Sequence, residues 1–118
     1  MGNRWSGVTV DCVDVELVAT FWSALLCLER GPSQDGWVYL GRRDDAGPRL
    51  VFQPVDEPKR GKVRLHLDVE VDDIDEAMTE VARLGGSTTG ERHDYPGAGV
   101  VVVMADPEGH EFCLTQYV

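Results

Sequence analysis

The feature that most constrains this chain is an internal repeat, in which Asp14 and Asp73 hold matching places 59 positions apart in a sequence of 118 residues. Segments 7–25 and 66–84 share an alternating strand, an Asp and a helical apolar stripe in the same order. Such self-similarity means that one supersecondary unit is used twice. We therefore expect a single domain made of two modules, residues 1–57 and 58–118.

Each module begins with a strand of period two. In segment 65–71, apolar residues alternate with His66, Asp68 and Glu70, so these three polar side chains share one face. Segment 7–12 repeats the alternation in the first module. One face of each predicted strand is thus apolar and faces a core.

A helix follows each strand. Asp14 and Asp73 stand where the helices should begin, and a carboxylate there accepts backbone N–H groups that otherwise lack partners. Apolar residues then recur at helical spacing, which predicts amphipathic helices that cover a sheet. The stripes are Val18, Phe21, Trp22, Leu25 and Leu26 in the first helix, and Ile74, Ala77, Met78 and Val81 in the second.

Further strands are expected after each helix, and Pro54–Lys62 is expected to connect the modules. In the first module the expected strands are 37–40 and 49–53, and a third strand is left unplaced. In the second module they are 87–92, 100–105 and 111–117. These elements predict the α+β class, as two tandem βαβββ modules with mixed, largely antiparallel sheets and helices on one face.

Composition excludes several classes of function. The net charge is −10 with no basic stripe, which argues against nucleic-acid binding. No apolar run approaches the roughly 20 residues of a membrane span, and segment 1–5 does not resemble a secretory signal. Three widely spaced cysteines predict no disulfide framework and fit a reducing cytosol. We expect a cytoplasmic protein that binds neither nucleic acid nor membranes.

Three stretches carry a family resemblance: 8–14 with Phe21-Trp22, 64–73, and 105–113 with its Asp-Pro-Glu-Gly turn. In this order they resemble the vicinal oxygen chelate superfamily, and within it the glyoxalase-like domains related to glyoxalase I and bleomycin-resistance proteins. The resemblance covers essentially the whole chain. It implies sheets that curl into a cup around a small-molecule site, with helices outside, and a homodimer.

The resemblance also implies four ligand positions in members that use a metal. They correspond here to Gly7, Gln53 (or Val51, if the register slips by two), His66 and Cys113. Glycine has no side chain to coordinate, and an amide oxygen is a weak ligand, so the set is incomplete for a Zn²⁺-type site. We expect no cofactor of the usual kind. If a divalent metal binds, His66 holds it with Gln53 or Cys113.

The best functional candidate is His66, because an imidazole can both give and accept a proton. Asp68 and Glu111 lie on the same face as His66 by parity, and either one could assist it in proton transfer. The catalytic residues that we predict are His66 and Glu111. A metal site shifted to include Asp68 or Glu111 stays open. A nucleophilic Cys113 would need His66 as its base.

Other residues are candidates for contacting a ligand. Trp37 and Tyr39 share a strand face and either stack on a flat ligand or pack as structure. His93 and Tyr95 lie on a Gly-rich connection, and Arg49 and Arg64 offer charges for an anionic ligand. The predicted ligand-binding set is His66, Asp68, Gln53, Cys113, Trp37, Tyr39 and Glu111.

Three functions remain open, since a fold does not fix function. The first is small-molecule binding of the resistance or sequestration type, without the usual metal site. The second is a lyase or isomerase in which His66 is the acid or base. The third is a metal-dependent glyoxalase or dioxygenase, which Gly7 and Cys113 disfavour.

Overall fold

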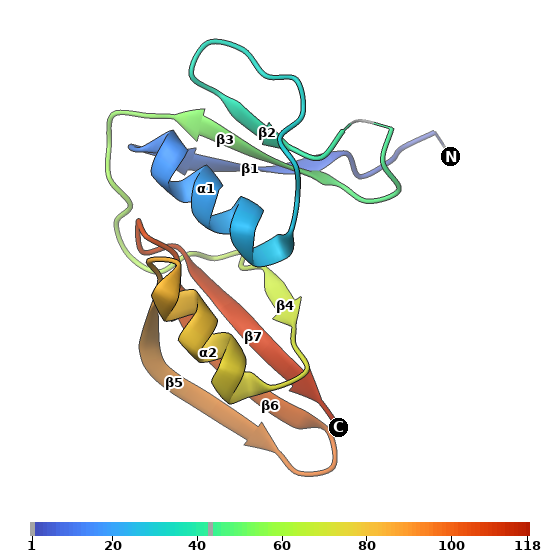
Figure 1. The fold of residues 1–118 in the computed structure, drawn as a ribbon, viewed down its shortest axis with the longest axis vertical. Coiled ribbons are helices and arrows are strands. Elements are labelled where there is room, and N and C mark those ends of the chain that lie inside the picture. The colour runs from blue at the N-terminus through green and yellow to red at the C-terminus, as the bar shows by residue number, and fades with distance from the viewer. Residues whose placement is uncertain (1, 43) are drawn as a thin grey trace. The chain divides into compact units, whose positions relative to one another are not determined.

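The computed structural model describes residues 2–42 and 44–118. Contacts divide the chain into two compact units, Met1–Pro58 and Lys59–Val118, one residue away from the division expected from the repeat. Among these residues, each unit contains one helix and one open sheet (Figure 1). In the part of the chain that is described, no helix is long and apolar enough to cross a membrane.

The first unit contains a three-stranded sheet in the order β1-β3-β2. Strand β1 pairs with β3 in parallel, whereas β2 pairs with β3 antiparallel. The bounds are β1 (Gly7–Cys12), α1 (Val15–Leu26), β2 (Val38–Leu40) and β3 (Arg49–Pro54).

The second unit contains a four-stranded sheet in the order β4-β7-β6-β5. Strands β4 and β7 are parallel, and the other neighbours are antiparallel. The bounds are β4 (Asp68–Glu70), α2 (Ile74–Arg83), β5 (Ser87–Tyr95), β6 (Gly99–Ala105) and β7 (Glu111–Tyr117). The α+β class and the repeated topology are therefore confirmed.

The units differ in one strand. The second has three strands after its helix, whereas two follow α1 among the described residues. In the second unit, β5 pairs along the edge of β6. At the corresponding edge of β2 in the first unit, an isolated antiparallel bridge joins Arg30 to Leu40. The third strand that the sequence left unclear is thus reduced to a single bridge.

Both helices begin at the predicted residues because each has a carboxylate cap. Asp14 accepts a hydrogen bond from the Leu17 amide at 3.1 Å, and Asp73 accepts one from the Glu76 amide at 3.0 Å. Each bond satisfies one of the amides that a helix start leaves without a partner. The predicted strand–cap–helix repeat is thus present in both units.

The apolar stripes face the core, with Val18, Phe21, Trp22, Ile74 and Val81 buried and Leu25, Leu26, Ala77 and Met78 half-buried. In α1 the buried side chains include Phe21 and Trp22, whose rings meet edge to face at 5.3 Å. In α2, Ile74 and Val81 are buried. The sheets contribute further core residues, namely Val38, Leu40, Leu50 and Phe52 in the first unit and Val102, Met104, Phe112 and Leu114 in the second.

The Asp-Pro-Glu-Gly turn fixes the connection from β6 to β7. Asp106 is buried, and its Oδ1 accepts from the amides of Glu108 at 2.9 Å and His110 at 3.1 Å. Gly109 has a φ of 86°, which an L side chain rarely adopts. Because the turn is built from its own polar groups, it sets where β7 begins.

The cap of α2 gives a stability prediction. Asp73→Ala removes the acceptor for the Glu76 amide and should lower the free energy of unfolding by about 1 kcal/mol. Urea unfolding followed by circular dichroism measures this change. The adjacent exposed Asp72, as Asp72→Ala, is the matched control and should stay within about 0.5 kcal/mol of the parent. Equal losses in both variants would contradict the capping role.

Candidate functional site

The parallel pairing of β4 with β7 brings the two ends of the second unit together. Asp68 lies opposite Cys113 in the register, and the Cys113 amide donates to the Leu67 carbonyl at 2.9 Å. That backbone bond continues the pairing beyond β4, toward His66. Residues separated by more than forty positions in the sequence are therefore held side by side.

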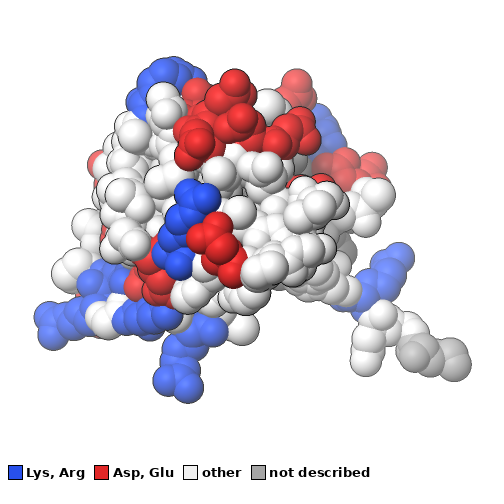
Figure 2. All heavy atoms as spheres, turned by 90° about the horizontal axis from the view of Figure 1, so that it is seen from below, with Lys and Arg blue, Asp and Glu red and all other residues white. Residues whose placement is uncertain are grey.

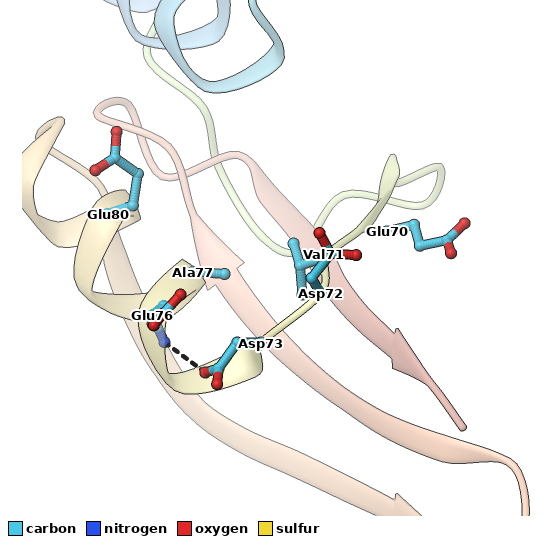
Figure 3. Close-up of a pocket in the computed structure, with 7 residues that line it drawn as sticks. All are labelled: Glu70, Val71, Asp72, Asp73, Glu76, Ala77 and Glu80. Atoms are coloured by element: carbon cyan, nitrogen blue, oxygen red, sulfur yellow. Dashed lines mark hydrogen bonds between the residues drawn. The ribbon is translucent and has the colours of Figure 1, made fainter.

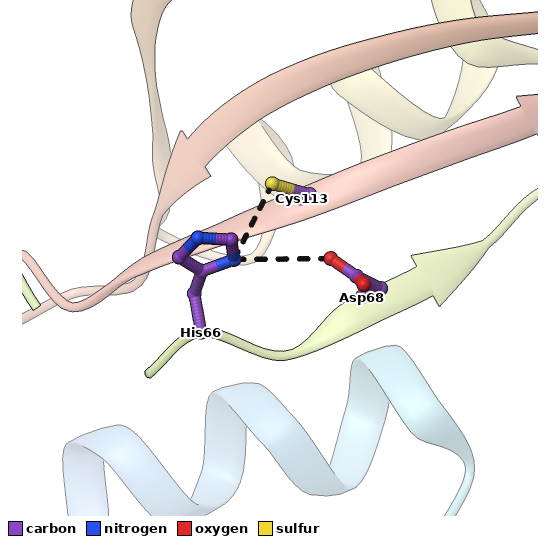
Figure 4. A group of neighbouring side chains, drawn as sticks. All are labelled: His66, Asp68 and Cys113. Atoms are coloured by element: carbon purple, nitrogen blue, oxygen red, sulfur yellow. Dashed lines mark hydrogen bonds and ion pairs between the residues drawn. The ribbon is translucent and has the colours of Figure 1, made fainter. Parts of the chain in front are cut away.

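The three side chains His66, Asp68 and Cys113 point toward one another (Figure 4). The His66 Nδ1 atom lies 3.8 Å from the Cys113 Sγ and 3.8 Å from the Asp68 Oδ1. The imidazole and the carboxylate are open to solvent, with 43% and 66% of their side-chain surfaces exposed, whereas Cys113 is buried. The group thus has a buried sulfur at its base and accessible nitrogen and oxygen atoms above it.

Both contacts of the imidazole are made by the same nitrogen. A cysteine nucleophile with an oriented base needs the thiol on one ring nitrogen and the carboxylate on the other. Here Cys113 and Asp68 both approach Nδ1 of His66. The arrangement does not match such a triad. It matches three donor atoms that converge on one point.

The environment of Cys113 keeps its thiol protonated. Burial raises its pKa, and the nearby Asp68 and Glu91 carboxylates raise it further, against an opposing effect of Lys62. A thiol of this kind is a poor nucleophile without a cation beside it. The nucleophilic role considered for Cys113 therefore lacks electrostatic support.

Strand β5 adds a second group of polar side chains. His93 Nε2 contacts the Glu91 Oε2 at 2.6 Å, and the His93 and Tyr95 rings stack with centroids 6.2 Å apart. The pKa of Glu91 is lowered, mainly by its hydrogen bond with His93. From the sequence, His93 and Tyr95 are expected on a connection after residue 92, but both lie in β5, which extends to Tyr95. Both are exposed, and their contact with a ligand stays a prediction.

Glu111 is engaged elsewhere. Its Oε1 lies 3.0 Å from Lys59 Nζ and accepts from the Val63 amide at 3.2 Å, and both charged side chains are largely buried. Burial alone would raise the pKa of Glu111, but the bonds from Lys59 and from backbone amides outweigh it and hold the pKa low. The structure thus places Glu111 in an ion pair that fastens segment 59–63 to β7. Its predicted catalytic role finds no support in these contacts.

The aromatic candidates lie in the first unit. The rings of Trp37 and Tyr39 meet edge to face at 6.3 Å, and the Arg49 guanidinium lies 4.8 Å from the centre of the Tyr39 ring. All three side chains are half-buried. They form one aromatic and cationic group, and stacking of a ligand on it stays a prediction.

Strand register shows which residue of the first unit matches Cys113. Thr9 of β1 pairs with Val51 of β3, just as Asp68 of β4 pairs with Cys113 of β7. The alternative register considered from the sequence is therefore the one that the sheets favour, and Gln53 lies two residues beyond, opposite Asp11. At this place the first unit offers a buried valine without a donor atom.

Gly7 occupies the other ligand position of the first unit, and its neighbourhood is tight. A Cβ atom built there would lie 2.9 Å from the Arg49 carbonyl oxygen. Any side chain at this residue would require β1 to move away from β3. The first unit therefore supplies neither of the two donors that the superfamily pattern would place there.

One surface depression of about 450 Å³ was not anticipated from the sequence (Figure 3). It lies at the start of α2 and is lined mainly by acidic residues, namely Glu70, Asp72, Asp73, Glu76 and Glu80 with Val71 and Ala77. Acidic side chains also gather on the surface seen in Figure 2. Asp73 is already occupied as the helix cap, and a solvated acidic face explains the rest.

Comparison with known proteins identifies the class. Residues 7–115 match the glyoxalase-like domain family, and the chain belongs to this family. No curated protein matches the chain.

Solved structures with the same fold share little sequence. A glyoxalase/bleomycin resistance protein/dioxygenase family enzyme from Burkholderia phytofirmans has a TM-score of 0.78 at 15% identity, over 96% of this chain and 98% of that one. The fosfomycin resistance protein FosX from Listeria monocytogenes gives 0.78 at 19%, over 98% and 94%. A lactoylglutathione lyase from Agrobacterium tumefaciens gives 0.67 at 17%, over 98% and 95%. At these identities the likeness shows that the chain shares their fold.

The Glu111 ion pair predicts a pH-dependent contribution to stability. Because its pKa in the folded chain is lowered, Glu111 stabilises above its unfolded value of about 4.3, and this contribution is lost as pH falls through the folded value. Glu111→Gln should thus reduce the free energy of unfolding at pH 7 by about 1–3 kcal/mol. The difference from the parent should be retained down to about pH 4.3 and shrink as the pH falls further, through the folded value.

Urea unfolding at several pH values measures the difference, with the exposed Glu57 as control through Glu57→Gln. A Glu111→Gln loss that stays constant from pH 7 to below pH 4 would contradict the ion-pair assignment.

Proposed function

We propose that this chain binds a small organic molecule on the sheet face that carries His66, Asp68 and Cys113, as a binding protein of the resistance or sequestration type. The supporting observation is the convergent group itself, in which solvent-accessible imidazole and carboxylate groups stand beside a buried thiol. A small number of placed polar side chains that converge on one point is typical of the groups that orient a ligand.

The metal chemistry of the usual superfamily pattern is the least supported alternative. Gly7 and Val51 provide no donor atoms from the first unit, and the Gly7 backbone lies too close to Arg49 to accept a side chain without a shift. The metal centre that a glyoxalase or dioxygenase of the usual pattern would need therefore has only half of its protein ligands in this chain. We propose that function does not depend on such a centre.

A lyase or isomerase activity is the second candidate, and one observation favours it. Asp68 lies on the Nδ1 side of the imidazole, which leaves Nε2 of His66 to exchange a proton with a substrate. The contact of 3.8 Å is longer than a hydrogen bond, so Asp68 would orient the ring only after a small movement. A homodimer in the cytoplasm remains part of the proposal, on the family resemblance and the three free cysteines.

A thermal-shift screen tests the proposal, with fosfomycin, bleomycin and S-lactoylglutathione among its probes. A ligand present at one hundred times its Kd adds about 2.7 kcal/mol, which should raise Tm by at least about 5 °C. Asp68→Asn should reduce this shift, whereas Asp72→Asn, an equally conservative change at a nearby exposed carboxylate, should retain it.

Ligands found in this screen also distinguish the binding protein from the lyase or isomerase. Binding without product supports sequestration, and turnover that His66→Ala abolishes while binding survives supports the enzyme. A hit whose shift is identical in Asp68→Asn and the parent would show that the ligand site lies elsewhere.

A further inference from the structure

We propose that the second unit alone binds one zinc ion, through Nδ1 of His66, a carboxylate oxygen of Asp68 and Sγ of Cys113. The inference is independent of the small molecule, because zinc can be measured whether or not an organic ligand is found. It also differs from the usual arrangement of the superfamily, since all three donors come from residues 59–118.

The geometry of the three donor atoms carries the proposal. They all lie within 4.8 Å of one another, with 3.8 Å from His66 Nδ1 to each of the other two. Tetrahedral zinc, with bonds of about 2.0–2.3 Å, separates its ligand atoms by roughly 3.4–3.6 Å. Small side-chain rotations would bring the observed set to that spacing.

The backbone holds these donors in register. The Asp68–Cys113 pairing and the bond from the Cys113 amide to the Leu67 carbonyl fix the strands that carry them. Asp68 is the first residue of β4, and His66 lies two residues before it with its imidazole pointing toward the Asp68 carboxylate (Figure 4). A site built on paired strands needs little ordering when the ion arrives.

The donor chemistry selects the ion. A thiolate sulfur favours zinc over the harder Mg²⁺ and Mn²⁺, whereas imidazole and carboxylate accept all of them to different degrees. On binding, the Cys113 thiol gives its proton to solvent and coordinates as thiolate. Three protein ligands leave a fourth tetrahedral position for water or for an oxygen of a bound molecule.

The surrounding charge favours a cation. The carboxylates of Asp68 and Glu91 both act on Cys113, and Lys62 opposes them as a single positive charge. Glu91 also acts electrostatically on His66 and is paired with His93. A divalent ion at the convergence point would compensate the negative charge that these two carboxylates exert on Cys113.

The proposal is tested by measuring the zinc affinity of the full chain. The chain is first freed of metal with a chelator and then competes for zinc with a chromophoric indicator. The parent should bind one zinc per chain. Cys113→Ser and Asp68→Asn should each weaken binding at least about tenfold. Cys27→Ser, at an exposed thiol, and Asp72→Asn should leave it unchanged.

Two further measurements make the result specific. Cobalt in place of zinc should give a near-ultraviolet thiolate charge-transfer band that Cys113→Ser abolishes and Cys27→Ser retains. Gln53→Ala should leave zinc affinity unchanged. Circular dichroism of each metal-free variant identifies any loss of binding that comes from unfolding. If Cys113→Ser does not fold, the isosteric surface change Asp68→Asn still tests the proposal.

Three results would overturn the proposal. They are the absence of stoichiometric zinc in the parent, unchanged affinity in folded Asp68→Asn, and a loss in Gln53→Ala as large as that in Asp68→Asn. The last would mean that the first unit contributes a ligand.

Discussion

The parallel pairing of the first and last strands of each unit is the constraint on which the candidate site depends. In the second unit it aligns β4 with β7, so residues near the start and the end of the unit face each other. Asp68 then lies opposite Cys113, and the Cys113–Leu67 backbone bond carries the pairing back toward His66, whose side chain meets the other two. The helix cap at Asp73 sets where α2 begins after β4, and the turn at Asp106 sets where β7 begins.

The same pairing in the first unit produces no such group. Gly7 and Val51 occupy the corresponding places in the register of β1 and β3, and neither offers a donor atom. Gly7 lies so close to the Arg49 carbonyl that a side chain could not be added without moving a strand. The packing of β1 against β3 therefore excludes a donor side chain at this residue. The duplicated scaffold has been kept, whereas the donor groups are concentrated in the second unit.

Much of the fold could be predicted from the sequence because it depends on local signals. Alternation over 65–71, the Asp caps and the helical stripes each specify an element by short-range physics, and the repeat supports each assignment twice. The membership in the glyoxalase-like family follows from motifs spread along the chain. The α+β class, the Asp caps and the family membership are confirmed. The strand expected over 65–71 is shorter in the structure, where β4 spans Asp68–Glu70 and Leu65 is 93% exposed.

The site was less predictable because it depends on register and on contacts between distant residues. Parity placed Glu111 with His66, but Lys59 and the Val63 amide hold that carboxylate in another interaction. The choice between Gln53 and Val51 required the pairing of β1 with β3. The approach of both Asp68 and Cys113 to one nitrogen of His66 has no sequence signal at all, since it depends on side-chain rotamers.

The central claim is that the reactive groups of this chain converge at one point within residues 59–118. Anomalous diffraction at the zinc edge, from crystals of the full chain grown with equimolar zinc, tests it most directly. The account predicts one strong peak within about 2.5 Å of His66 Nδ1, Asp68 and Cys113 Sγ. A peak bound by residues of the first unit, or no peak at this group, would contradict it.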